Sequence, residues 1–117
     1  MAGRTVLIVD DERYIVDLLS DLLEEEGYRV RRAYDGLAAL EAIDADPPDL
    51  VLADVMMPRL DGLTMAATLI ERGTRIPIIL MSAAVTPRNA GIAFIAKPFD
   101  IEEMLEHVER MVGPATT

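Results

Sequence analysis

Five short apolar runs, each separated from the next by a segment with helical periodicity, are the feature that most constrains the fold of this chain. We predict strands at residues 5–9, 28–33, 49–53, 77–81 and 92–95. Several of the runs are continuous, such as TVLIV at the first and IAFI at the last, which is typical of strands that are buried on both faces of a sheet.

Apolar residues recur with helical spacing between these runs. The segment after the first run predicts an amphipathic helix, because its apolar residues follow the i, i+3, i+4, i+7, i+8 pattern at Ile15, Leu18, Leu19, Leu22 and Leu23. Similar patterns predict helices near residues 37–43, 63–70 and 101–112. Asp100 is expected to cap the last of these helices.

Alternation of strands and helices predicts a parallel sheet with right-handed crossovers and helices on both faces. We therefore expect a doubly wound three-layer α/β sandwich. The fold class we assign is flavodoxin-like, in which five strands have the order 2-1-3-4-5. One connection is unusual, since only residues 83–91 (AAVTPRNAG) separate the fourth and fifth strands. Parallel connections usually need at least about 10–12 residues, so the fourth helix is predicted to be truncated or absent.

Length and composition restrict the class of protein. A chain of 117 residues is expected to form one domain over residues 1–117. The sequence shows neither an apolar run long enough to span a membrane nor a secretory signal, so the cytoplasm is the expected location. There is no cysteine, which excludes disulfides and thiolate metal sites. A formal charge of −10 disfavours direct nucleic-acid binding.

All but one of the basic residues are of the same type, and the exception is a single lysine. Ten of the eleven positively charged residues are arginine, and Lys97 is the only lysine. A lone lysine in such a chain suggests a site that needs a compact, strongly hydrated charge, although biased composition alone would also leave one lysine.

Polar and charged residues follow most of the predicted strands. Asp10 and Asp11 follow the first strand, Asp54 the third, Ser82 the fourth and Lys97 the fifth. In a sheet of order 2-1-3-4-5 the first and third strands are neighbours, so their three carboxylates should converge at the edge where such sheets bind ligands.

Three carboxylates without nearby histidine or cysteine suit a hard cation, and Mg²⁺ is the cation we predict. With a divalent cation present, Asp54 could act as a nucleophile that forms an acyl phosphate. The alternative for Asp10 and Asp11 is a solvated strand end at which Asp11 caps the following helix.

These segments together resemble the receiver domains of response regulators in two-component signalling, including those of the chemotaxis type. The matching segments cover essentially the whole chain: VLIVDDE at 6–12, DLVLADVMMPRLDG at 49–62, IPIILMSA at 76–83 and AKPFD at 96–100. The resemblance implies that Asp54 is the phosphoacceptor. It also implies that Asp11 binds Mg²⁺ directly, that Asp10 binds it mainly through water, and that the backbone carbonyl of Met56 completes the protein ligands.

The resemblance further implies a switch. Lys97 would pair with the phosphoryl group, and Ser82 would bond one of its oxygens; movement of Ser82 would then let Phe94 turn inward. The Lys97–Pro98 peptide is expected to be cis. The short connection at residues 83–91 departs from the family pattern and puts the usual dimerisation in doubt, so we leave the oligomeric state open.

The function implied is that of a regulatory domain, not an enzyme, which assists its own phosphorylation and dephosphorylation. The phosphoryl group would come from a sensor histidine kinase or a histidine phosphotransfer protein, and the signal would pass to a downstream effector protein. Two alternatives are a phosphate shuttle in a multi-step phosphorelay and a Mg²⁺-dependent aspartyl phosphohydrolase. The second is disfavoured because Val55 and Met56, rather than an Asp-x-Asp pattern, follow Asp54. A flavin-binding protein would need a phosphate loop where this chain has Asp10 and Asp11.

Overall fold

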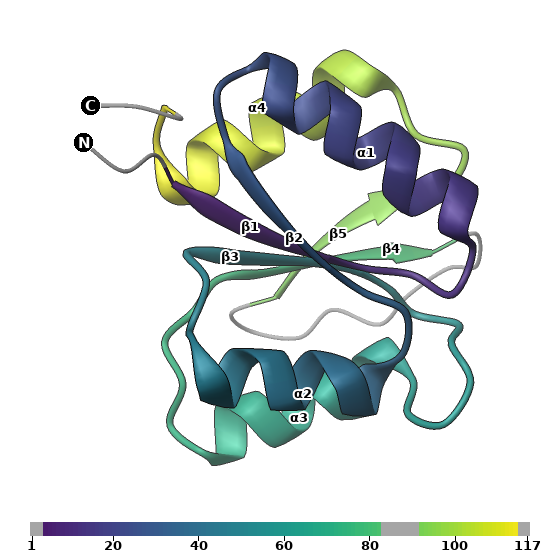
Figure 1. Cartoon of the computed structure of the whole chain (residues 1–117), viewed down its shortest axis with the longest axis vertical. Coiled ribbons are helices and arrows are strands. Elements are labelled where there is room, and N and C mark those ends of the chain that lie inside the picture. Colours follow the sequence, from purple (N-terminus) through teal and green to yellow (C-terminus); the bar gives the residue numbers. More distant parts are fainter. Residues whose placement is uncertain (1–3, 83–91, 115–117) are drawn as a thin grey trace.

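The computed structural model describes residues 4–82 and 92–114 as one α/β sandwich (Figure 1). The elements are β1 (Thr5–Val9), α1 (Arg13–Glu25), β2 (Arg29–Ala33), α2 (Gly36–Ala45), β3 (Leu50–Asp54), α3 (Gly62–Glu71), β4 (Ile78–Ser82), β5 (Ile92–Ala96) and α4 (Ile101–Val112). The five strands pair in parallel in the order β2-β1-β3-β4-β5, which confirms the predicted topology. The predicted truncated helix falls at residues 83–91 and lies outside the described residues.

The helices form two layers around the sheet. Helices α1 and α4 cover one face, and α2 and α3 cover the other (Figure 1). Each face has its own apolar cluster, so alternate residues of the central strands point into different clusters: Val6 and Ile8 of β1 face α1 and α4, whereas Leu7 and Val9 face α2 and α3. This two-sided burial explains why the central strands have continuous apolar sequences.

The predicted burial on both faces holds for the central strands and only partly for β5. Every residue of β3 and β4 is buried, whereas Ile92, Ala93 and Phe94 of β5 are half-buried. Strand β5 lies at the edge of the sheet, where fewer neighbours cover it. Strands β3 and β4 also begin and end one residue later than predicted, so Asp54 and Ser82 are the last residues of their strands. No helix within the described residues is long and apolar enough to cross a membrane.

Aspartate caps begin three of the helices. The side chains of Asp35, Asp61 and Asp100 accept hydrogen bonds from backbone N–H groups in the first turns of α2, α3 and α4, which confirms the prediction for Asp100. Helix α1 is different, because its N-cap is Glu12 and makes no side-chain capping bond. The alternative in which Asp11 caps this helix is therefore wrong, and the Asp11 side chain is exposed beside β1.

The Asp61 cap gives a prediction about stability. Its Oδ1 accepts a hydrogen bond from the backbone N–H of Thr64 at 2.8 Å, and its Oδ2 accepts one from the Thr64 hydroxyl at 2.9 Å. The bond from the Thr64 backbone is the main cause that lowers the pKa of Asp61 below its ordinary value of 3.8. We expect Asp61→Ala to lower the free energy of unfolding by about 1 kcal/mol at neutral pH, measured by urea denaturation.

The pH dependence of this loss follows from the direction of the pKa shift. Because the folded-state pKa is depressed, the charged cap stabilises the fold above the unfolded-state pKa, and this stabilisation disappears as the pH falls through the folded-state pKa. The difference in the free energy of unfolding between wild type and Asp61→Ala should therefore become smaller in acid. Asp61→Asn is the matched control, since an amide still caps the helix but does not titrate in this range; an equal loss in Asp61→Asn and Asp61→Ala would contradict the capping account.

Candidate functional site

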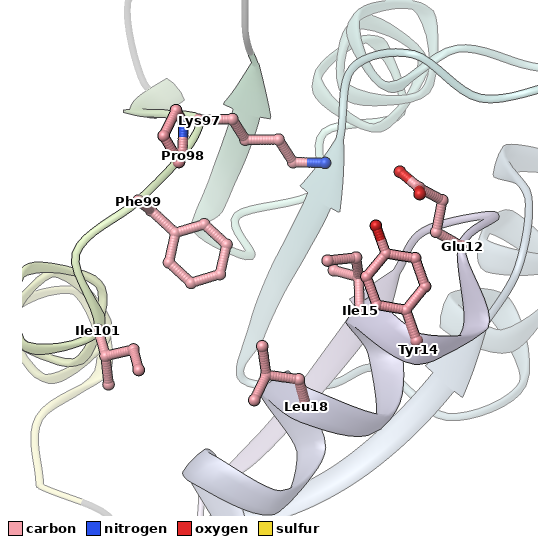
Figure 2. A pocket seen from close by; sticks show the side chains of 8 residues that line it. All are labelled: Glu12, Tyr14, Ile15, Leu18, Lys97, Pro98, Phe99 and Ile101. Atoms are coloured by element: carbon pink, nitrogen blue, oxygen red, sulfur yellow. The ribbon is translucent and has the colours of Figure 1, made fainter.

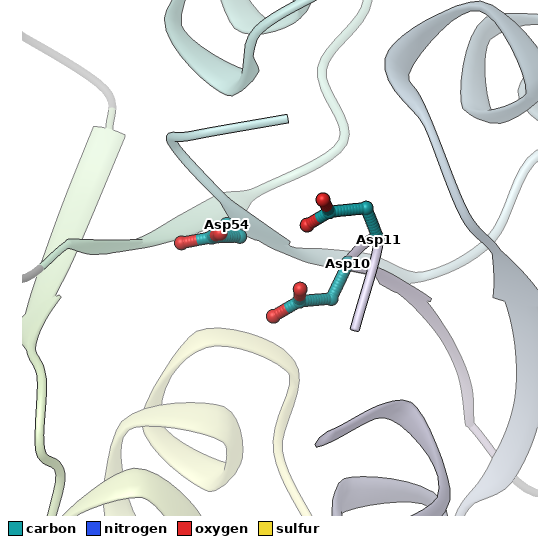
Figure 3. Close-up of side chains that lie close together, drawn as sticks. All are labelled: Asp10, Asp11 and Asp54. Carbon is teal, nitrogen blue, oxygen red and sulfur yellow. The ribbon is translucent and has the colours of Figure 1, made fainter. Parts of the chain in front are cut away.

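Three carboxylates meet at the carboxyl edge of the sheet (Figure 3). Asp10 and Asp11 directly follow β1, Asp54 ends the neighbouring strand β3, and one oxygen of each lies within 4.8 Å of the others. Asp10 is fully buried, Asp54 is nearly so, and Asp11 is exposed. The structure thus brings together the three acids that the sequence placed at adjoining strand ends.

Lys97 reaches the acidic cluster from the end of β5. Its Nζ lies 3.2 Å from Asp54 Oδ1 and 3.4 Å from Asp10 Oδ2, and its side chain is 18 % exposed. Among the described residues, three carboxylates face one ammonium, which leaves an excess of negative charge in this pocket. The donor set consists of carboxylate oxygens, so both its charge and its chemistry fit a hard divalent cation such as Mg²⁺.

Burial and charge act in opposite directions on the ionisation of this cluster. Burial is the largest influence on Asp10 and raises its pKa, although the Glu12 backbone N–H and the Lys97 ammonium oppose that rise. Burial alone would lower the pKa of Lys97, but the carboxylates of Asp10 and Asp54 together outweigh it, so the pKa is raised and the ammonium form is favoured. A cation in the pocket would favour the charged form of Asp10 and so offset the penalty that burial places on it.

Ser82 and Phe94 lie on β4 and β5, near this edge. Ser82 is the buried last residue of β4, and its backbone carbonyl accepts a hydrogen bond from the Lys97 N–H at 2.8 Å. Phe94 pairs with Leu80 in the β4–β5 register, is half-buried and packs against the cluster that faces α2 and α3. A backbone hydrogen bond therefore links Ser82 to Lys97. The switching role of Ser82 and Phe94 stays a prediction.

Tight contacts hold the β3–α3 loop (residues 55–61), which carries Met56, close to Asp54. The Val55 N–H donates to the Met81 carbonyl and the Gly62 N–H donates to the Val55 carbonyl, both at 2.9 Å. A Cβ at Gly62 would lie 2.4 Å from the Asp54 carbonyl oxygen, so only glycine permits this approach. The Met56 side chain is exposed, and the role of its carbonyl as a ligand stays a prediction.

An apolar groove beside the cluster was missed by the sequence analysis. It has a volume of about 470 Å³ and lies between the start of α1 and the β5–α4 connection (Figure 2), lined by Glu12, Tyr14, Ile15, Leu18, Lys97, Pro98, Phe99 and Ile101. Leu18 and Ile101 belong to apolar stripes that predict core positions, yet they are 44 % and 42 % exposed because they line this groove. The Lys97–Pro98 peptide is cis, as predicted.

A family model for the response regulator receiver domain matches residues 6–109 of the chain. The chain belongs to this family. As a receiver domain it is a regulatory module of phosphorylation-dependent two-component signalling, and the acidic cluster corresponds to the pocket in which the family typically binds Mg²⁺.

Relatives and solved structures agree with this membership. The response regulator MprA of Mycobacterium ulcerans is 40 % identical over 114 residues, which cover 92 % of this chain and 49 % of that protein. MprA of Mycolicibacterium vanbaalenii is 39 % identical over 118 residues, covering 95 % of this chain and 51 % of that protein. The chain therefore spans about half the length of the curated relatives that it matches.

The fold of this receiver domain is close to those of solved receivers. The receiver domain of the Francisella response regulator 1452 superposes with a TM-score of 0.88 at 30 % identity, covering 93 % of this chain and 96 % of that one. The chemotaxis response regulator CheY4 of Vibrio cholerae gives a TM-score of 0.83 at 27 % identity, covering 92 % and 98 %.

Proposed function

We propose that this receiver domain is a phosphorylation-dependent switch in which Asp54 accepts the phosphoryl group from a histidine kinase or a histidine phosphotransfer protein. The observation that carries this proposal is the meeting of Asp10, Asp11 and Asp54 with the ammonium of Lys97 at one edge of the sheet. Asp54 is the proposed nucleophile because it ends β3, the central strand of the sheet, and matches the phosphoacceptor position of the family; Lys97 contacts both Asp54 and Asp10.

Mg²⁺ would be held in this proposal by the carboxylates of Asp11 and Asp54 and by the Met56 carbonyl, with Asp10 acting mainly through water. When bound, it would neutralise negative charge on the phosphoryl oxygens. A carboxylate oxygen of Asp54 attacks phosphorus and forms the acyl phosphate. The bond from phosphorus to the donor imidazole breaks, its electron pair stays on the imidazole nitrogen, and that nitrogen takes up a proton. Lys97 then pairs with a phosphoryl oxygen, since its ammonium already lies within 3.2 Å of Asp54 Oδ1.

The output of the switch passes through Ser82 and Phe94. A phosphoryl group on Asp54 draws the Ser82 hydroxyl toward it, and Phe94, which is only half-buried on the edge strand, turns into the space that Ser82 leaves. This movement changes the surface of β4 and β5 that a downstream effector protein contacts. The partners in this proposal are proteins, not nucleic acid or membrane. The proposed domain spans residues 1–117, and its proposed location is the cytoplasm.

The apolar groove supports a protein as phosphodonor. It begins at Lys97, so a donor that seats a side chain or a helix against Leu18, Phe99 and Ile101 has its reactive histidine near Asp54. Exposed apolar residues in a groove of this kind are typical of protein contact sites.

Acetyl phosphate tests the proposed chemistry without a kinase. The protein is incubated with acetyl phosphate in Mg²⁺ or in EDTA, and intact-mass measurement followed by peptide mapping locates the added phosphoryl group. We expect one phosphoryl group on Asp54 in Mg²⁺ and little or none in EDTA. A phosphoryl group on another residue, or equal labelling in EDTA, would contradict the proposal.

A further inference from the structure

Arg59 has an unusual backbone conformation in the β3–α3 loop. Its φ is +70°, and it is the one residue other than glycine with a positive φ in the described part of the chain. This left-handed region is disfavoured for a residue with a Cβ, and such residues persist where the surrounding structure holds them in place. The surroundings of Arg59 therefore indicate what its conformation achieves.

The Arg59 side chain is paired with the start of α2. Its guanidinium Nη1 lies 3.5 Å from Asp35 Oδ2, and the Asp35 side chain is only 16 % exposed. Asp35 is itself fixed, because its Oδ1 caps α2 by accepting a hydrogen bond from the Ala38 N–H at 2.8 Å. One carboxylate thus uses separate oxygens to hold the helix and the loop.

Gly36 and Leu60, which follow Asp35 and Arg59 in the sequence, make a second contact between the two segments. A Cβ at Gly36 would lie 2.3 Å from the Leu60 carbonyl oxygen and 2.8 Å from the Leu60 Cβ, so the backbone of the loop rests directly on the first residue of α2. At its base the loop is closed by the bond from the Gly62 N–H to the Val55 carbonyl. Met56 therefore lies between two fixed parts of the loop: its base, where Val55 bonds Gly62, and its far end, where Arg59 and Leu60 contact the start of α2.

We propose that Arg59 is a positioning residue, which through its ion pair with Asp35 holds the β3–α3 loop so that the Met56 carbonyl is oriented for Mg²⁺. This inference rests on the proposed function, because it takes the Met56 carbonyl to be a ligand. Its physical basis is pre-organisation: a loop that is already ordered loses less conformational freedom when its carbonyl binds the cation.

The test measures Mg²⁺ affinity by isothermal titration calorimetry in Arg59→Gly and Asp35→Asn. Glycine accepts a positive φ without strain and asparagine still caps α2, so both variants should fold, which urea denaturation without Mg²⁺ checks. We expect each variant to bind Mg²⁺ about two- to fivefold more weakly, the range that a partly exposed ion pair supplies, and the double variant to be no weaker than either.

Charge alone predicts the opposite result for Arg59→Gly. Removing a positive charge near a cation site should tighten Mg²⁺ binding by simple electrostatics, whereas loss of positioning should weaken it. The matched control is Arg72→Gln, which removes another arginine paired with an aspartate of α2: Arg72 Nη1 lies 3.4 Å from Asp44 Oδ2, away from the loop. This control should not weaken Mg²⁺ binding. Arg59→Lys, which keeps the charge, should recover much of the affinity.

The outcomes separate this inference from the proposed function. Unchanged or tighter Mg²⁺ binding in Arg59→Gly would overturn the positioning role. So would weaker binding in Arg59→Gly with normal binding in Asp35→Asn, because that pattern would assign the effect to the flexibility of glycine. A wild-type protein that does not bind Mg²⁺ would instead overturn the proposed function itself.

Discussion

Asp54→Asn is expected to abolish phosphorylation by acetyl phosphate. An amide has nearly the shape of a carboxylate but carries no negative charge, so it cannot attack phosphorus and form an acyl phosphate. Asp54 is almost fully buried at the end of β3, and because asparagine has nearly the same size and shape, the substitution should leave the sheet intact. Intact-mass measurement after incubation in Mg²⁺ should show no added phosphoryl group where the wild-type protein shows one.

Asp61→Asn provides the matched control for this experiment. It makes the same chemical change seven residues further along, at the cap of α3, where the carboxylate bonds Thr64 and not Lys97. We expect this control to be phosphorylated like the wild type. Persistent labelling of Asp54→Asn would contradict the assignment, and peptide mapping would then show whether Asp11, the exposed acid of the cluster, is the acceptor.

The acidic cluster could be predicted from sequence because it depends on topology and little else. Asp10, Asp11 and Asp54 end or follow two strands whose apolar runs are continuous, and neighbouring parallel strands place such residues at one edge. Lys97 stands out in the sequence as the only lysine, and the structure places its ammonium against two of the three acids. These residues needed only the parallel sheet, which the alternating pattern predicts, and the strand order 2-1-3-4-5 of the flavodoxin-like fold.

The groove and the loop contact could not be predicted in the same way. Leu18 fits the apolar stripe of α1 as well as Leu19 does, and only the packing of the β5–α4 connection decides that Leu18 lines a groove while Leu19 is buried. Arg59 and Asp35 lie in separate loops with no shared periodicity. Their contact depends on how closely α2 approaches the β3–α3 loop, which Gly36 and Leu60 set through atomic contacts.

Lys97→Met is expected to slow phosphorylation by acetyl phosphate about 100-fold. Methionine keeps an unbranched side chain but removes the ammonium, which lies 3.2 Å from Asp54 Oδ1 and would pair with the phosphoryl oxygens as charge develops on them. Loss of one such group typically costs about two to three orders of magnitude in rate. The rate is followed by intact mass against time at saturating Mg²⁺.

Mg²⁺ binding should change in the opposite direction in the same variant. Without the ammonium, the carboxylates of Asp10 and Asp54 lose a positive charge within 3.4 Å, so the pocket attracts a divalent cation more strongly. Calorimetry should therefore show tighter Mg²⁺ binding in Lys97→Met, together with slower phosphorylation. Weaker Mg²⁺ binding would indicate instead that Lys97 orders the pocket. Lys97→Arg separates the two roles, because it keeps the charge but replaces a compact ammonium with a wide planar group; it should retain the Mg²⁺ affinity of the wild type while phosphorylation remains slow.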